Sequence, residues 1–110
     1  MRGAPGLGEF EQLVLLAILQ LGSAAHAPGI RTAIEEAASR AVTRGALYTT
    51  LERLETKGYL RWRPEPGPPV RGGIPRRCFV LTAAGLGAVR RARAAVANLS
   101  RGLDGQLGSA

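Results

Sequence analysis

The sequence predicts a mainly α-helical domain with a small two-stranded sheet (class α+β), and three observations lead to this prediction. First, residues 43–58 carry one apolar stripe at the i, i+4, i+7 spacing of a helix packed on a core, made by Leu47, Leu51 and Leu54. Second, residues 59–63 and 76–81 alternate as strands do. Third, the connecting residues 64–75 are dominated by Pro and Gly, as in a loop. Helix, strand, basic loop and strand in this order predict a winged helix-turn-helix.

The first helix is expected from about Gly8 to Leu21, before Gly22. Residues 13–19 are apolar on every side of this helix, which predicts that every side is buried. A small domain cannot easily cover such a helix, so the pattern favours a dimer. The alternative is a helix at the centre of the monomer core.

The second helix is expected over Pro28–Ser39, because proline is acceptable in a first helical turn. Its inner stripe comprises Ile30, Ala33, Ile34 and Ala37, while Arg31, Glu35 and Glu36 are expected to face water. Residues 40–42 form the turn. Thr43 is the predicted N-cap of the third helix, which is expected to end at Gly58.

The last helix is expected over residues 83–104, capped by Thr82, with a narrow apolar seam. Because it follows the wing, no monomer surface remains for it, and we expect it to pair with a second copy. The predicted dimer interface joins this seam to the first helix and comprises Leu13, Leu16, Leu86, Val89, Val96, Leu99 and Leu103. The expected organisation is a flexible N-terminus (1–7), a winged helix-turn-helix (8–82), a dimerisation helix (83–104) and a flexible tail (105–110).

Positive charge is concentrated where the third helix and the wing are predicted. The 110-residue chain has a net charge of +7, and residues 40–77 hold nine Lys or Arg against three Glu. This distribution favours binding to the phosphates of duplex DNA. RNA modules usually carry stacking aromatic residues on a sheet, and the Ala-rich last helix is a weak candidate for membrane binding.

The same segments resemble the PadR-like transcriptional regulators over about residues 9–100. The residues that carry the resemblance are Gly45-Ala46-Leu47-Tyr48, Thr50 to Glu55, Gly58-Tyr59-Leu60, Arg76-Arg77, Phe79 to Thr82 and Gly85. The sequence departs from the family pattern at Cys78-Phe79, where two aromatics are usual. It also departs at Ala27-Pro28-Gly29, where Gly-Tyr-Glu often follows a histidine.

The resemblance implies a winged-helix homodimer that represses transcription, with release by a small-molecule effector in many members. It also implies dimerisation through the C-terminal region. A dimer would place two recognition helices about 34 Å apart, in successive major grooves of a palindromic operator. The remaining alternative is a winged helix that serves as a protein-interaction or dimerisation adaptor without sequence-specific DNA binding.

The candidate DNA-binding residues lie on the exposed face of the third helix and on the wing: Thr43, Arg44, Tyr48, Thr49, Arg53, Arg71, Arg76 and Arg77. Arg44 could pair with a guanine or contact a phosphate. Tyr48 could contact a phosphate or pack against the second helix. The wing arginines are expected to hold phosphates, with a solvated strand edge as the alternative.

Catalytic, metal and cofactor sites are not expected. No phosphate loop or nucleophile–base set is present, so an enzyme is improbable. Cys78 and His26 are the only residues of their types, and by themselves they are too few for a zinc site. Cys78 is interpreted as inert core and His26 as a helix-entry residue. The absence of a signal peptide or membrane-length apolar segment favours a cytoplasmic protein, and the Arg, Ala, Gly and Pro usage suggests a bacterial source.

Overall fold

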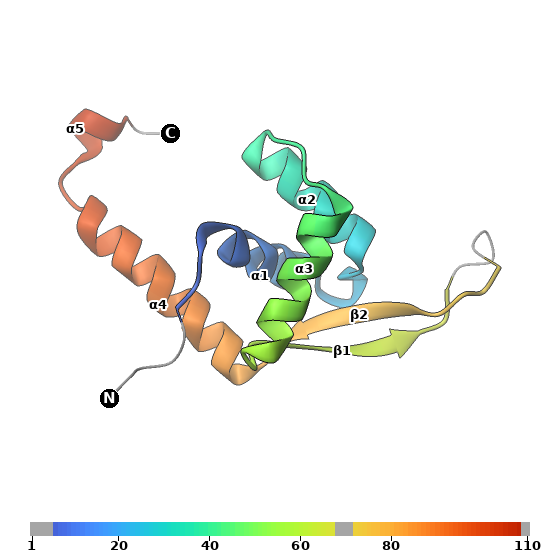
Figure 1. Cartoon of the computed structure of the whole chain (residues 1–110). Helices are drawn as coiled ribbons and strands as arrows, with labels where there is room; N and C mark the ends of the chain where they lie inside the picture. The colour runs from blue at the N-terminus through green and yellow to red at the C-terminus, as the bar shows by residue number, and fades with distance from the viewer. Residues whose placement is uncertain (1–5, 68–71, 109–110) are drawn as a thin grey trace.

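The computed structural model describes residues 6–67 and 72–108 and confirms the predicted architecture. The elements are α1 (Glu9–Leu21), a 3-10 turn η1 (Gly22–Ala24), α2 (Ala27–Ala38), α3 (Arg44–Thr56), β1 (Leu60–Glu65), β2 (Arg76–Leu81), α4 (Ala83–Ser100) and α5 (Asp104–Leu107). The two strands form an antiparallel wing, which extends away from the helices on the side opposite α4 and α5 (Figure 1).

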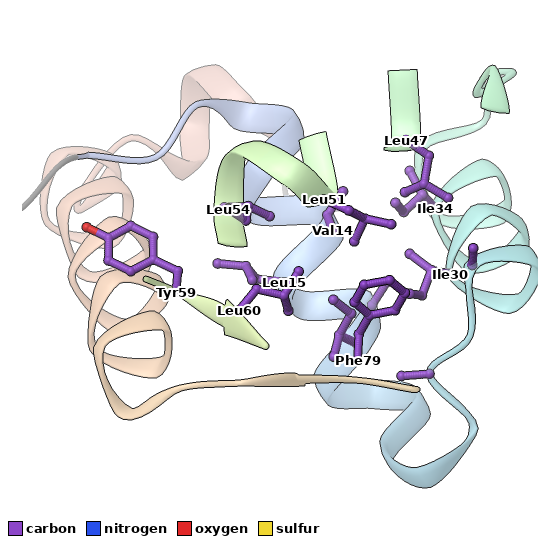
Figure 2. Packing of buried hydrophobic residues seen from close by; sticks show 14 of the residues in the cluster. Val14, Leu15, Ile30, Ile34, Leu47, Leu51, Leu54, Tyr59, Leu60 and Phe79 are labelled. Carbon is purple, nitrogen blue, oxygen red and sulfur yellow. The ribbon is translucent and has the colours of Figure 1, made fainter. Parts of the chain in front are cut away.

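The core lies between α1, α2, α3 and the base of the wing (Figure 2). Its members are the apolar stripes of the three helices and the inward residues of the strands. The central side chains are Val14, Leu15, Ile18, Ile30, Ile34, Leu47, Leu51, Leu54, Tyr59, Leu60 and Phe79. The leucine stripe of α3 is thus confirmed as its core face, and Ile30 and Ile34 are confirmed as the core face of α2.

Side chains of α2 close the turn between α2 and α3. The Arg31 guanidinium donates a hydrogen bond to the Val42 carbonyl (2.6 Å), and the Val42 N–H donates to the Glu35 carboxylate (2.9 Å). The Arg31 and Glu35 side chains are 44% and 34% exposed, as predicted, and in addition both satisfy backbone groups that the turn leaves unpaired. Thr43 is confirmed as the N-cap, since its hydroxyl accepts from the Ala46 N–H (3.1 Å).

The first strand is longer than predicted, because Pro64 and Glu65 belong to β1 and not to the loop. Pro64 lies opposite Arg77 in the ladder. A two-stranded sheet has only edge strands, and an edge strand tolerates a residue without an N–H group. The extension matters for the site, because it places the Glu65 side chain in an ordered position.

The wing and α4 are fixed to the body by backbone groups. The Phe79 N–H donates to the Ala25 carbonyl (2.9 Å), which joins β2 to the segment before α2. The Thr82 N–H donates to the Tyr59 carbonyl (3.1 Å), and the Thr82 hydroxyl accepts from the Gly85 N–H (3.0 Å). Thr82 is thereby confirmed as the cap of α4, and the helix starts from a fixed position on the base of the sheet.

Within the single chain, helix α1 is buried on one side only, so the alternative of a helix at the centre of the monomer core was wrong, and burial of its other side by a second copy stays a prediction. Val14, Leu15 and Ile18 lie in the monomer core, but Leu16 is half-buried and Leu19 is 46% exposed. The monomer has enough elements to cover one face of α1. The other face stays uncovered within the single chain.

Helix α4 ends earlier than predicted, at Ser100 and not at residue 104. Gly102 adopts a positive φ of 80°, which turns the chain into the short helix α5. Leu103 therefore lies between two helices, outside the seam to which it was assigned, and part of the predicted flexible tail is helical. Within α4, Val89 is buried, whereas Val96 and Leu99 are 59% and 81% exposed.

An ion pair that is largely shielded from solvent joins α1 to the end of α3. The Lys57 ammonium donates to both oxygens of Glu11 (3.0 and 2.8 Å), and the Glu11 side chain is only 7% exposed. Burial alone would raise the pKa of the Glu11 carboxyl. Hydrogen bonds from Lys57 and from the Gly8 N–H outweigh it, and they hold this pKa below its ordinary value.

This carboxylate should make stability depend on pH. Because the folded state lowers the pKa of Glu11, its contribution is complete above the unfolded value of 4.5 and is lost as the pH falls through the folded pKa. We expect Glu11→Gln to be less stable than the parent at neutral pH and to lose less stability on acidification to about pH 3. Urea unfolding across this range measures the effect, with Glu9→Gln on the exposed side of α1 as control. Parallel pH profiles for the parent and Glu11→Gln would contradict the assignment.

Candidate nucleic-acid interface

A groove of about 670 Å³ lies where the starts of α2 and α3 face the N-terminal part of β2. The groove is lined by residues from the start of α2, from the first turns of α3 and from the N-terminal part of β2. The lining residues are His26, Ala27, Pro28, Arg31, Arg44, Leu47, Tyr48, Pro75, Arg76, Arg77 and Phe79. Four of them are arginines and none is acidic, so the groove is suited to an anionic partner.

Arg44 and Tyr48 lie one turn apart on the side of α3 that faces the wing. The Arg44 guanidinium carbon lies 5.5 Å from the centre of the Tyr48 ring, so the two side chains stack. Both are exposed, Tyr48 to 38%. A guanidinium supported by an aromatic ring is preordered for a bidentate contact with phosphate or guanine.

The two wing arginines that line the groove differ in the contacts that hold their side chains. The Arg77 guanidinium lies 4.3 Å from the centre of the Trp62 ring, and the Trp62 indole N–H donates to Glu55 of α3 (3.1 Å). Arg76 is half-buried, and its Nε atom is buried without a hydrogen-bond partner among the described residues. Arg77 is therefore held in place against the sheet, whereas Arg76 lines the groove with its Nε atom shielded from solvent.

The groove brings together four of the predicted DNA-binding residues, namely Arg44, Tyr48, Arg76 and Arg77. Thr43 and Thr49 are exposed on α3 but do not line the groove. Arg53 also lies outside it, close enough to Glu11 for its charge to act on that carboxylate. Arg71 lies outside the described residues.

Sequence analysis missed the contribution of α2 to this groove. Ala27 and Pro28 form its wall, and Arg31 adds a charge while it also closes the turn. Arg31 carries a local signal, since it follows the expected helix start and is basic. Its position opposite the wing depends on how α2 packs and has no signal in the sequence.

A second group of side chains joins the start of α2 to the wing. The His26 ring nitrogen Nε2 and the Glu65 Oε1 atom are 2.8 Å apart, and the Arg63 guanidinium donates to Glu65 Oε2 (2.9 Å). The hydrogen bond with His26 lowers the pKa of Glu65, and bonds from Cys78 and Arg63 add to this effect against the cost of burial. Cys78 is buried, as its interpretation as a core residue predicted. His26 occupies the N-cap position of α2, but its ring contacts Glu65 and does not cap the helix.

A second groove of about 500 Å³ lies between α1 and α4. Helix α4 lies on the side of the molecule away from the wing (Figure 1). It is lined by Leu16, Leu19, Leu86, Val89, Arg90, Arg93, Ala94 and Ala97. Three residues of the predicted dimer interface, Leu16, Leu86 and Val89, meet here.

None of the helices in the described parts of the chain has the length and apolarity needed to cross a membrane.

The fold is similar to those of two solved proteins. A PadR-like transcription factor from Bacteroides fragilis is similar in structure, with a TM-score of 0.67, 24% identity and 86% coverage of both chains. A Thermoplasma acidophilum protein described as a transcriptional regulator has a TM-score of 0.67, 16% identity and coverage of 89% of this chain and 92% of its own. These likenesses concern the fold. A comparison with curated proteins gave no match.

The family model described as the transcriptional regulator PadR-like family matches residues 15–91, which include all of α2, α3 and the wing strands. The match covers well over half of the chain and confirms the resemblance seen in its motifs. The chain belongs to the PadR-like family of transcriptional regulators, a membership that implies DNA binding and no enzymatic activity.

Proposed function

We propose that the protein is a homodimeric repressor that binds a palindromic operator through the groove between α3 and the wing. The observation that carries this proposal is the convergence of four arginines from three elements, Arg31, Arg44, Arg76 and Arg77, on one groove without a lining carboxylate. Residues 8–82 would form the DNA-binding part, and the region of α4 would form the dimer.

On DNA, α3 would enter the major groove by its N-terminal half, as recognition helices do. Arg44 and Thr49 would face base edges, with Thr43, Tyr48 and the wing arginines Arg76 and Arg77 on the flanking phosphates. The Thr43 hydroxyl accepts a hydrogen bond from the Ala46 N–H as the helix cap, and its O–H remains able to donate to a phosphate oxygen. Arg53 lies outside the groove, within range of Glu11 of α1, and would reach only the outer backbone.

The uncovered apolar side chains of α1 and α4 support dimerisation. Leu19 lines the groove between α1 and α4 and is 46% exposed, and Val96 and Leu99, in the C-terminal half of α4 outside this groove, are exposed to 59% and 81%. Covering them with a second copy would remove apolar surface from water. The paired subunits would set the spacing of the two recognition helices, and an effector that prefers a different spacing would release the operator.

A salt titration of DNA binding tests the proposal. We expect random-sequence duplex DNA to bind with micromolar affinity, and log affinity to fall linearly with log salt with a slope of several, because bound arginines release counterions. Fluorescence anisotropy measures the binding, and sedimentation equilibrium of the same sample measures the mass, which should be that of two chains.

Two results would contradict the proposal in different ways. A dimer without affinity for duplex DNA even at low salt would favour the adaptor alternative. A monomer that binds DNA with the expected salt slope would be consistent with the groove as the DNA interface, but it would contradict the proposed dimer. In the second case the search for an operator would use a single half-site.

A further inference from the structure

We propose that His26, Glu65 and Cys78 form a binding site for a divalent transition-metal ion of the zinc type. One imidazole nitrogen, one carboxylate oxygen and one sulfur, all potential ligand atoms, lie within 4.8 Å of one another. The three residues come from the start of α2, the end of β1 and the middle of β2. No two of them are close in sequence, so the fold alone creates the cluster.

The donor set fits a borderline or soft ion. Sulfur and imidazole ligands select zinc and its neighbours, whereas calcium and magnesium prefer oxygen ligands. Three protein ligands with a fourth position left to water are a common zinc arrangement. Metal–ligand bonds of about 2.0–2.3 Å put tetrahedral ligand atoms roughly 3.3–3.8 Å apart. The His26–Glu65 separation of 2.8 Å would have to widen by about 0.5–1 Å, and the sulfur would have to approach by up to about 1–1.5 Å.

The surroundings hold the ligands in place. The bond from the Phe79 N–H to the Ala25 carbonyl (2.9 Å) joins the backbone beside Cys78 to the backbone beside His26. Arg63 occupies Glu65 Oε2, which leaves Oε1 as the atom directed at His26. Carboxylates that bind metals are usually oriented by a hydrogen bond to a neighbouring side chain, as Arg63 orients Glu65 here.

Access and charge are compatible with an ion. The His26 and Glu65 side chains are 12% and 24% exposed, so an ion can enter from their side, while Cys78 forms the buried end at 2%. Binding would displace the thiol proton of Cys78, whose sulfur atom lies 3.6 Å from the Ser23 carbonyl oxygen. A divalent ion that releases one proton adds one net positive charge at the edge of the arginine groove, which His26 also lines.

The competing interpretation is a hydrogen-bonded His26–Glu65 pair that simply ties α2 to the wing, with Cys78 as a neighbouring core residue. Cobalt(II) distinguishes the two because a thiolate–cobalt bond produces an intense near-ultraviolet charge-transfer band. The chain has one cysteine and one histidine, so in the untagged full-length protein this band can arise only from Cys78.

The experiment titrates untagged protein, freed of metal with a chelator, with cobalt(II) and then with zinc(II). We expect a one-to-one charge-transfer band, visible ligand-field bands of tetrahedral intensity, loss of both on adding zinc, and release of one proton per zinc. His26→Gln and Glu65→Gln should each weaken cobalt affinity by at least about tenfold, the lower end of the loss seen when even a hydrogen-bond partner of a ligand is removed.

Glu55→Gln is the matched control, because it removes a carboxylate that also bonds a wing side chain but lies outside the cluster. It should bind cobalt as the parent does. Circular dichroism establishes that each variant is folded. The proposal is overturned by a folded parent protein without a charge-transfer band, or by a band of equal affinity in the parent, His26→Gln and Glu65→Gln. This test does not involve DNA, so its outcome is independent of the proposed repressor function.

Discussion

Replacement of both Arg44 and Arg76 by alanine is expected to abolish tight operator binding while the fold and the dimer persist. Arg44 is exposed and stacked on Tyr48, and Arg76 lines the groove, and neither side chain belongs to the hydrophobic core. A good bidentate arginine contact contributes about 1–3 kcal/mol, so each replacement should weaken binding by roughly ten- to a hundredfold. Anisotropy titration at fixed salt measures the loss.

The salt dependence then separates the roles of the two arginines. Removing an arginine that contacts a phosphate lowers the slope of log affinity against log salt by about 1. An arginine on guanine instead relaxes specificity at one position. We expect Arg76→Ala to change the slope and Arg44→Ala to change either the slope or the preference for one base pair.

A double variant of equal charge change is the control. Arg91→Ala with Arg101→Ala removes two exposed arginines from α4 and its C-cap, outside the groove. If both double variants lose affinity equally, net charge governs binding and the groove between α3 and the wing is not the interface.

Gly85→Ala is expected to destabilise the protein strongly, although alanine is the better helix former. A Cβ atom at residue 85 would overlap the backbone carbonyl of Tyr59, so α4 would have to move off the base of the sheet. Alanine gains about 1 kcal/mol of helix propensity, but overpacking against rigid backbone typically costs 1–3 kcal/mol or more. We expect the free energy of unfolding to fall by about 2 kcal/mol, which corresponds to a decrease in Tm of roughly 10 °C.

Gly87→Ala isolates the clash from helix propensity. Its Cβ would meet only the end of the Arg91 side chain, at 3.3 Å, and this side chain can move. We expect Gly87→Ala to be neutral or to stabilise the protein by about 1 kcal/mol. Thermal unfolding of the two variants in parallel provides the measurement. A Gly85→Ala protein as stable as Gly87→Ala would show that the contact between α4 and Tyr59 does not constrain the helix.

Local sequence determined most of the secondary structure, because each signal acts within a few residues. Thr43 and Thr82 cap helices through their own hydroxyls, and the leucines of α3 mark its buried face by their spacing. The concentration of positive charge on α3 and the wing could likewise be read from the chain. So could family membership, because the motifs that carry it are contiguous.

Element boundaries were less predictable where tertiary contacts compete with composition. Pro64 is a turn signal in sequence, yet it lies in β1 because pairing with β2 continues on an edge where its missing N–H is not needed. The apolar pattern of residues 13–19 indicated burial on every side of α1. How much of α1 the monomer covers depends on the number of elements packed around it, which no local pattern reports.

The sequence by itself determined the winged helix-turn-helix, its basic face and the helix caps. Only the tertiary structure decided which side chains meet across long separations in the chain. His26, Glu65 and Cys78 lie 39 and 13 residues apart in sequence, and the wall that α2 adds to the arginine groove lies far from the wing in the chain. The physical reason is that periodicity, capping and turn propensity act over one or two helical turns. Contacts between elements depend instead on how their buried faces pack against a common core.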